Sequence, residues 1–221
     1  MAEKMNGAPV IGREQVKPLL ETRFIRVFDL EYAPGRHYYD ATRRTADELV
    51  AIKGEEEAKQ MLPDAVSCVV VLECEGQEPK LLLSMEYRYP AGRFLLSVPA
   101  GLIDPEDREK PDALLCTARR EIREETGLAV GEGDTMTIIN PFMYSTPGMT
   151  DESNALVGVR MHVPDLSALT QEGAEGSERF DGFVLLGLEE ARKLLRSGRD
   201  QFGHFYSVYT FAALTWFVAG F

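Results

Sequence analysis

The sequence is short of positive charge, of cysteine and of histidine. It has 24 Lys and Arg residues against 36 Asp and Glu residues, so its formal net charge is −12. Non-specific binding to nucleic acid requires a cationic surface, and this balance argues against nucleic acid as a partner. The three cysteines and three histidines are scattered without metal-ligand spacing, which argues against a structural zinc site.

Long apolar runs are also missing. The longest candidate for a membrane span, residues 205–221, is too short and is interrupted by Tyr, Ser, Thr and Trp, so it predicts a core helix and no membrane insertion. No signal peptide is evident, and the odd number of cysteines is typical of a reducing compartment. We therefore expect a cytoplasmic protein in which Cys68 and Cys116 are buried thiols.

What is present fits a globular chain. The 221 residues are 44% hydrophobic and 27% charged, enough for one domain of ordinary size plus a small extra element. Residues 1–22 show no clear period and predict a mobile start. Residues 24–32 and 37–41 predict a β-hairpin around a turn at 33–36. The charge-rich residues 45–63 predict either a short helix or a flexible insert.

The rest of the chain alternates strand and helix patterns. Two β-branched or aliphatic runs predict a pair of strands at 65–73 and 80–88, joined by a turn at Gly76. Further apolar runs predict strands at 93–99, 135–141, 154–162 and 183–187, and helices at 188–197 and 204–217. No repeat or linker divides the chain into independent domains.

One stretch, residues 101–128, carries the chemistry. Read as a helix, Leu115, Ala118 and Ile122 form an apolar stripe, and Gly127 suits the left-handed position that ends a helix. Glu121, Glu124 and Glu125 then share one face within a single turn. Clustered carboxylates are the ligands that Mg²⁺ or Mn²⁺ prefers, although a solvated helix face with local ion pairs is the ordinary explanation for such a run.

The residues in front of the helix favour the metal site. A strand pattern at 97–99 is followed by a polar loop and then by the carboxylate helix. Residues 120–128, Arg-Glu-Ile-Arg-Glu-Glu-Thr-Gly-Leu, match every specified position in the second half of the Nudix hydrolase signature. The first half departs from it. Counting back from Arg120 places the family's first Glu at Asp112, eleven residues after Gly101 where the family has six.

The resemblance implies an α+β fold, an α/β/α sandwich with a mixed sheet, preceded by a small N-terminal antiparallel β-element. It divides the chain into an N-terminal element and charged insert at 1–64 and a Nudix domain at 65–221. The hairpin resembles that of ADP-ribose pyrophosphatases, in which the N-terminal sheet contributes to a homodimer and to the nucleotide site. A homodimer acting on a small-molecule nucleotide is therefore expected.

The resemblance also assigns residues. Glu121 and Glu125 are the expected metal ligands, with Glu124 and the Ala100 carbonyl as further ligands and Arg120 orienting the glutamates. Arg88 is expected near the substrate phosphates, because a planar bidentate donor suits a diphosphate. Arg43 and Arg44 are either phosphate contacts or solvated strand-end charges. The loop at Pro147 and Gly148 is expected to line the sugar side.

A general base is harder to assign. In the ADP-ribose branch a Glu of the late loop often takes this role, which points first to Glu178 and second to Glu175, unless this loop is acidic because it is solvated. The expected reaction is metal-dependent hydrolysis of a nucleoside diphosphate sugar, with ADP-ribose giving AMP and ribose 5-phosphate. The alternatives are another nucleoside diphosphate derivative or a non-catalytic nucleotide-sugar sensor.

Overall fold

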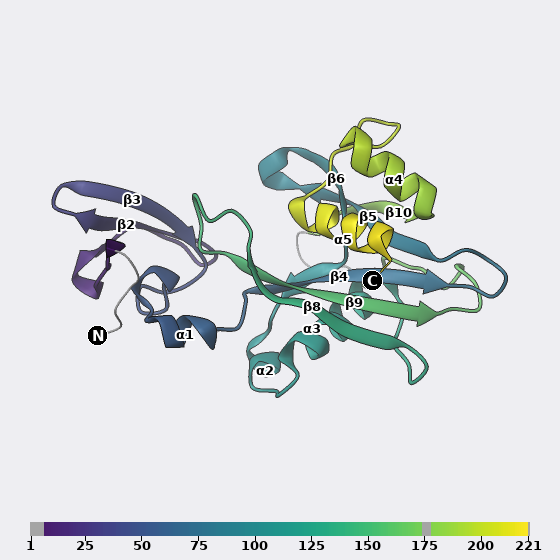
Figure 1. Cartoon of the computed structure of the whole chain (residues 1–221), viewed down its shortest axis with the longest axis horizontal. Helices are drawn as coiled ribbons and strands as arrows, with labels where there is room; N and C mark the ends of the chain where they lie inside the picture. The colour runs from purple at the N-terminus through teal and green to yellow at the C-terminus, as the bar shows by residue number, and fades with distance from the viewer. Residues whose placement is uncertain (1–6, 174–177, 221) are drawn as a thin grey trace. The chain divides into compact units, whose positions relative to one another are not determined.

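A computed structural model describes residues 7–173 and 178–220 (Figure 1). The chain forms two compact units. The smaller unit contains Met1–Asp64 and Phe142–Asn154, and the larger contains Ala65–Pro141 and Ala155–Phe221. By its contacts, the segment 142–154 is grouped with the smaller unit.

The smaller unit is built on a three-stranded antiparallel sheet in the order β1–β2–β3. Its strands are β1 (Val16–Glu21), β2 (Arg26–Ala33) and β3 (Arg36–Thr42). Three short helical turns flank these strands in the sequence. They are η2 (Arg13–Gln15) before β1, and η3 (Val50–Ile52) and α1 (Glu55–Lys59) after β3. Phe28, Leu30 and Leu49 form its core.

The N-terminal sheet differs from the expectation in one strand. The hairpin β2–β3 was predicted, and Gly35 at φ 67° makes its tight turn. The strand β1 was not, because residues 1–22 were expected to be a mobile start. β1 pairs with β2 through Val16↔Leu30 to Glu21↔Arg26. Its side chains are mostly exposed, so no alternation of apolar and polar residues marked it as a strand.

The larger unit contains most of a seven-stranded sheet, in which five strands have the order β10–β5–β4–β9–β8 and β6 and β7 pair with β5 and β4. The end of β8 (142–144) and the start of β9 (153–154) belong to the smaller unit. The strands are β4 (Ala65–Glu73), β5 (Lys80–Arg88), β6 (Arg93–Ser97), β7 (Ala100–Leu102), β8 (Thr135–Tyr144), β9 (Ser153–His162) and β10 (Phe180–Leu186). β4 and β5 have the predicted bounds, and nearly every residue of β4 is buried.

Helices cover the sheet on both sides. They are α2 (Pro105–Arg108), α3 (Ala113–Thr126), α4 (Leu188–Ser197) and α5 (Val208–Ala219). Figure 1 shows α2 and α3 on one side of the sheet and α4 and α5 on the other, which confirms the α+β class with its mixed sheet and N-terminal antiparallel element. None of the helices within the described residues is long and apolar enough to span a bilayer.

Two helix starts differ from the sequence prediction. α5 begins at Val208 rather than near residue 204, because the Ser207 hydroxyl accepts a hydrogen bond from the Thr210 amide and caps the helix. α2 was expected to be polar loop. Pro105 stands in its first turn and Asp104 takes the N-cap position, so the long connection between β7 and α3 contains a helical turn of its own.

Candidate active site

Helix α3 holds Glu121, Glu124 and Glu125 against the short strand β7. Ala118 and Ile122 are fully buried and fix the helix on the sheet, and Gly127 ends it at φ 74°. With the helix anchored in this way, Glu121 is 5% exposed and Glu125 is 4% exposed, although both are carboxylates. Buried carboxylates require hydrogen bonds or positive charge to offset the cost of leaving water.

Gly101 lets the strand approach these carboxylates. A Cβ atom at this position would lie 1.9 Å from Glu121 Oε1, which no real pair of atoms tolerates. On the neighbouring residue, the Ala100 amide donates a hydrogen bond of 3.1 Å to Glu125 Oε1. The backbone of β7 therefore forms one wall of the carboxylate cluster, and a side chain at residue 101 would require the Glu121 carboxylate or the strand to move.

Burial dominates the electrostatics of the cluster. Desolvation raises the pKa of Glu121 to about 7, and the neighbouring charges of Glu124 and Glu178 add to the rise. The pKa of Glu125 is raised well above its ordinary value, first by burial and then by the charges of Glu86, Glu121 and Glu178. A site that makes its own carboxylates hard to ionise gains strongly from a cation placed among them.

Arg120 organises the edge of the cluster. Its Nη1 atom lies 2.7 Å from Glu121 Oε1 and 3.0 Å from Glu124 Oε2, and its Nη2 atom donates to the Leu102 carbonyl at 2.8 Å. Its Nε atom lies 3.4 Å from Asp107 Oδ2. One guanidinium thus bridges two glutamates that would otherwise repel, as the sequence predicted for this arginine.

The first acidic residue of the signature is Asp107, not Asp112. Asp107 is six residues after Gly101, the family's own spacing, and it is 6% exposed where it meets Arg120. Asp112 stands at the N-cap of α3 and pairs with Arg119 at 3.6 Å in an exposed contact. Counting back from Arg120 was misleading, because the five extra residues lie between Asp107 and the helix.

The side chains of Lys110 and Thr117 also contact the Asp107 carboxylate. The Lys110 ammonium lies 2.8 Å from its Oδ1 atom, and this hydrogen bond, with those from Arg120, lowers the pKa of Asp107. The Thr117 hydroxyl donates to its Oδ2 atom at 3.3 Å. The extra residues therefore supply a turn in which Lys110 pairs with Asp107, and Asp107 in turn contacts Arg120.

We expect Asp107→Asn to slow the reaction about tenfold to a hundredfold, because Arg120 would lose an anionic support and hold Glu121 less firmly. Asp112→Asn is the matched control, since Asp112 makes no contact with Arg120 among the described residues, and it should leave turnover within about twofold of wild type. Steady-state kinetics on both variants measure this difference. Equal losses in the two variants would show that Asp107 does not support Arg120.

Glu86 is a member of the cluster that sequence reasoning missed. It lies near the end of β5, where burial raises its pKa and the charge of Glu178 adds to the rise. The Arg88 guanidinium lies 2.6 Å from its Oε2 atom. The alternation of β5 places residues 86 and 88 on one face of the strand, and this was the available signal.

The cluster fits a divalent cation. Glu86, Glu121, Glu124, Glu125 and Glu178 influence one another electrostatically, while Arg88 and Arg120 are the cations that pair with them. Within the described residues no three side chains are already spaced as ligands of one ion. Arg120 contacts oxygens of Glu121 and Glu124, and the Ala100 amide contacts an oxygen of Glu125.

The structure brings most of the expected residues of the larger unit together. Ala100, Arg120 and the three helix glutamates meet, and Arg88 joins them through Glu86. Glu178, the first choice for the general base, is among the charges that raise the pKa values of Glu121 and Glu125. Glu175, the second choice, lies outside the described residues.

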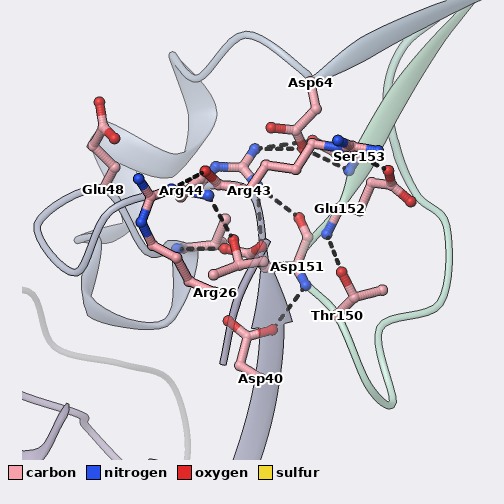
Figure 2. A network of polar contacts seen from close by, with 12 residues as sticks. Arg26, Asp40, Arg43, Arg44, Glu48, Asp64, Thr150, Asp151, Glu152 and Ser153 are labelled. Carbon is pink, nitrogen blue, oxygen red and sulfur yellow. Dashed lines mark hydrogen bonds and ion pairs between the residues drawn. The ribbon is translucent and has the colours of Figure 1, made fainter. Parts of the chain in front are cut away.

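Expected site residues of the smaller unit take part in a separate polar network (Figure 2). Arg44 is 9% exposed, and its guanidinium contacts Asp64 at 2.9 Å, Asp151 at 3.1 Å and the Ser153 hydroxyl at 3.2 Å. Its charge is thus used inside the unit, which differs from the contacts expected of a phosphate-binding arginine. Arg43 has an exposed guanidinium 3.4 Å from Glu152.

The loop around Pro147 and Gly148 is tied to β3. The Tyr38 hydroxyl donates to the Gly148 carbonyl at 2.7 Å, and the Ala41 amide donates to the Met149 carbonyl at 3.0 Å. Both contacts lie within the smaller unit. The loop is therefore held by the N-terminal sheet, which explains why residues 142–154 belong to that unit.

The network contains one poorly compensated carboxylate, and it predicts a pH effect. Burial and the neighbouring charge of Asp151 raise the pKa of Asp40 to about 6. An acid whose pKa is raised in the folded state costs stability as pH increases from its ordinary value near 4 to 6 and above. We expect Asp40→Asn to increase the free energy of unfolding by about 1–3 kcal/mol at pH 8 and by much less at pH 4. Denaturant unfolding at the two pH values measures this; an equal change at both would contradict it.

The family comparison agrees with this geometry. The family model described as "NUDIX domain" matches residues 61–206, which include the sheet, α3 and the carboxylate cluster. The chain belongs to the Nudix family. Gly101 and Asp107, which lie within the matched residues, have the spacing of the first half of the signature and are followed by a longer spacer.

Two curated Nudix relatives are similar to part of the chain. It is 32% identical over 135 residues to an ADP-ribose pyrophosphatase of Bacillus subtilis, covering 61% of this chain and 64% of that protein. It is 32% identical over 117 residues to an ADP-sugar pyrophosphatase of Mus musculus, covering 53% and 50%. The chain thus spans between half and two thirds of the length of these Nudix relatives.

A solved structure shows the same fold. It is described as the crystal structure of an ADP compounds hydrolase, and it superposes with a TM-score of 0.55 over 93% of this chain and 92% of that chain. The sequence identity is 18%, so this likeness concerns the fold alone.

Proposed function

We propose that this Nudix protein hydrolyses the pyrophosphate bond of a nucleoside diphosphate sugar, with ADP-ribose as the first candidate and AMP and ribose 5-phosphate as products. The observation that carries the proposal is the cluster of buried glutamates against β7, whose raised pKa values mark a site built for a cation. The names of the two curated relatives support the choice of an ADP-linked sugar.

The cluster would hold Mg²⁺ or Mn²⁺ through Glu121 and Glu125, with Glu124 and the Ala100 carbonyl as further donors. Oxygen donors of this kind suit hard divalent cations. When bound, such an ion neutralises phosphate charge and lowers the pKa of the attacking water. A binding-only domain has little need for several adjacent carboxylates that are costly to bury.

The protein's own residues would do the remaining work. Arg88 is half-exposed beside Glu86, and its planar guanidinium can bind the diphosphate through two hydrogen bonds. Arg120 keeps Glu121 and Glu124 oriented. Glu178 would accept the proton of the attacking water, since it lies within electrostatic reach of Glu121 and Glu125.

A panel of nucleoside diphosphate sugars and dinucleotides tests the proposed substrate. With Mg²⁺ present, we expect ADP-ribose to give the highest kcat/KM and to yield AMP, followed on an HPLC trace. A clear preference for a dinucleotide, or for a nucleoside diphosphate sugar without adenine, would keep the chemistry but replace the substrate. Saturable binding of ADP-ribose with no turnover of any compound would favour the sensor.

We further propose a homodimer that uses the smaller unit. Its sheet and the turns around it carry exposed apolar side chains, and an exposed apolar surface of this kind is typical of an interface. They are Leu19, Leu20, Phe24, Ile25, Tyr38 and Tyr39. Light scattering coupled to gel filtration should give twice the chain mass at micromolar concentration. A monomer at every concentration tested would contradict the dimer.

A further inference from the structure

The hairpin formed by β5 and β6 carries an arginine to which the proposed reaction assigns no role. The two strands pair as far as Arg88↔Arg93, and the turn η4 (Tyr89–Ala91) connects them together with Gly92, whose φ is 64°. Arg93 is therefore the residue directly opposite Arg88, the arginine proposed to bind the diphosphate. All of these residues lie in the larger unit.

The two arginines share one face of the hairpin. Residues directly opposite each other in an antiparallel pair point to the same side, with Cβ atoms about 4.5–5.5 Å apart. The preceding pair shows this contact on the other face, where the rings of Tyr87 and Phe94 meet edge to face with centroids 5.3 Å apart. Because side chains alternate along a strand, Arg88 and Arg93 lie on the face that also carries Glu86.

The positive charge of this face is only half balanced. The Glu86 carboxylate pairs with Arg88 at 2.6 Å. Within residues 7–173 and 178–220, Arg93 has no carboxylate partner; its Nε atom donates to the Ala91 carbonyl at 3.2 Å, and its two terminal nitrogen atoms have no hydrogen-bond partner. Like charges placed directly opposite each other destabilise a strand pair, so an anion between the two guanidinium groups would be bound favourably.

The same face lies beside the carboxylate cluster. The charge of Glu86 is among the causes that raise the pKa of Glu125, and the charge of Glu178 helps to raise the pKa of Glu86. A diphosphate held at the cluster by a divalent cation would therefore bring its negative charges close to both arginines. Hydrogen bonds from guanidinium to phosphate are among the strongest in proteins, and the planar group can donate two in parallel.

We propose that Arg93 is a second substrate-binding arginine, which contacts the diphosphate together with Arg88 from across the hairpin. This inference rests on the proposed function. Arg88 is held by Glu86, whereas Arg93 keeps its terminal N–H groups available for phosphate oxygens. A diphosphate has two phosphoryl groups and can accept hydrogen bonds from both guanidinium groups at once, which places anionic oxygens between two like charges.

The probe is α,β-methylene ADP, a diphosphate whose P–C–P bridge cannot be hydrolysed. Its binding to the full chain with Mg²⁺ is measured by isothermal titration calorimetry. Arg93→Gln removes the charge and should raise the Kd roughly tenfold, the size expected for one lost hydrogen bond to a charged group. Arg93→Lys keeps the charge and should stay within about threefold of wild type. Thermal unfolding checks that each variant is folded.

Arg192→Gln is the matched control. Arg192 pairs with Glu189 on α4, a helix on the other side of the sheet from α3, so the substitution removes the same charge away from the cluster (Figure 1). Its Kd should stay within about twofold of wild type. Equal weakening in Arg192→Gln and Arg93→Gln, undiminished binding in Arg93→Gln, or a lysine variant that binds no more tightly than the glutamine variant would overturn the role of Arg93.

Turnover of ADP-ribose, measured in parallel, separates this inference from the proposed function. In Arg93→Gln we expect KM to rise about tenfold and kcat to stay within about threefold of wild type, because the contact is made before and during the reaction. A wild type that binds the analogue but hydrolyses no nucleotide would refute the hydrolase, and the comparison of Kd values would still decide the role of Arg93. Turnover with an unchanged KM in Arg93→Gln, or no binding of the analogue by the wild type, would refute the role of Arg93.

Discussion

Glu121→Gln is expected to lower turnover of ADP-ribose by about three orders of magnitude or more while the protein stays folded. Glutamine keeps the shape of the side chain but removes the negative charge that a divalent cation requires. Glu121 is 5% exposed, so little water can reach its carboxylate. Steady-state kinetics with saturating Mg²⁺ measure the loss, which should fall on kcat more than on KM.

The same substitution should stabilise the metal-free protein. Because burial raises the pKa of Glu121 to about 7, the folded state holds a proton that the unfolded state releases near pH 4.5. Stability is therefore lost as pH rises from 4.5 through 7, and the glutamine variant avoids this loss. In EDTA at pH 8 we expect Glu121→Gln to be more stable than wild type by on the order of 1–3 kcal/mol.

Glu132→Gln is the matched control for both measurements. Glu132 lies on an exposed turn before β8, outside the helix that carries the cluster. Its substitution by glutamine removes the same charge. It should change neither turnover nor metal-free stability measurably. Near-normal turnover in Glu121→Gln would refute its assignment as a metal ligand, and a metal-free variant less stable than wild type at pH 8 would refute the account of its burial.

Gly101→Ala is expected to reduce turnover by about two orders of magnitude. The added methyl group would lie 1.9 Å from Glu121 Oε1 and 2.1 Å from Glu121 Cδ, so the carboxylate or the strand must move. Either movement disturbs the contact between Glu121 and Arg120. Displacements of about 1 Å in an active site are enough for losses of this size.

Gly133→Ala provides the control, because a Cβ atom at Gly133 would meet nothing within 4 Å and the residue does not require a left-handed backbone. It should retain wild-type activity. The two variants add the same methyl group, so their difference isolates the contact with Glu121. Comparable activity in Gly101→Ala and Gly133→Ala would show that the close approach of β7 to α3 is not needed for turnover.

The parts of the fold with strong local patterns were predicted well from the sequence. β4 and β5 have the expected bounds because their buried runs are long and β-branched or aliphatic, and Gly76 makes the turn between them. α3 was predicted from its apolar stripe together with Gly127 as its stop. α4 also has its predicted bounds. In each of these elements the periodicity and the stop signals agree.

The missed features are those that no local pattern of apolar and polar residues marks. β1 is mostly exposed and exists because β2 pairs with it. The segment 142–154 belongs with the N-terminal sheet through hydrogen bonds such as that from Tyr38 to Gly148, which no local pattern encodes. Cys116 was expected to be a buried thiol, but it is only partly buried and contacts Asp112. Cys68 is fully buried, as predicted.

The residues of the candidate site also divide into those that the sequence predicted and those that only the folded structure brings together. The shared face of Glu121, Glu124 and Glu125 follows from spacing, because i, i+3 and i+4 positions share one helix face, whereas the role of Arg120 is what the Nudix resemblance implied. Glu86 comes from a different strand and joins the cluster only through folding. Because the spacer is longer, counting back from Arg120 led to Asp112 instead of Asp107. The contact between Asp107 and Arg120 is known only from the folded structure.

The most direct test of the central claim is AMP formation from ADP-ribose by the wild-type chain with Mg²⁺, compared with the same reaction in EDTA and with Glu121→Gln. We predict equal amounts of AMP and ribose 5-phosphate from the wild type with Mg²⁺, and almost none in EDTA or from the variant. AMP formation that is unaffected by EDTA and by Glu121→Gln would contradict a metal-dependent site at the carboxylate cluster.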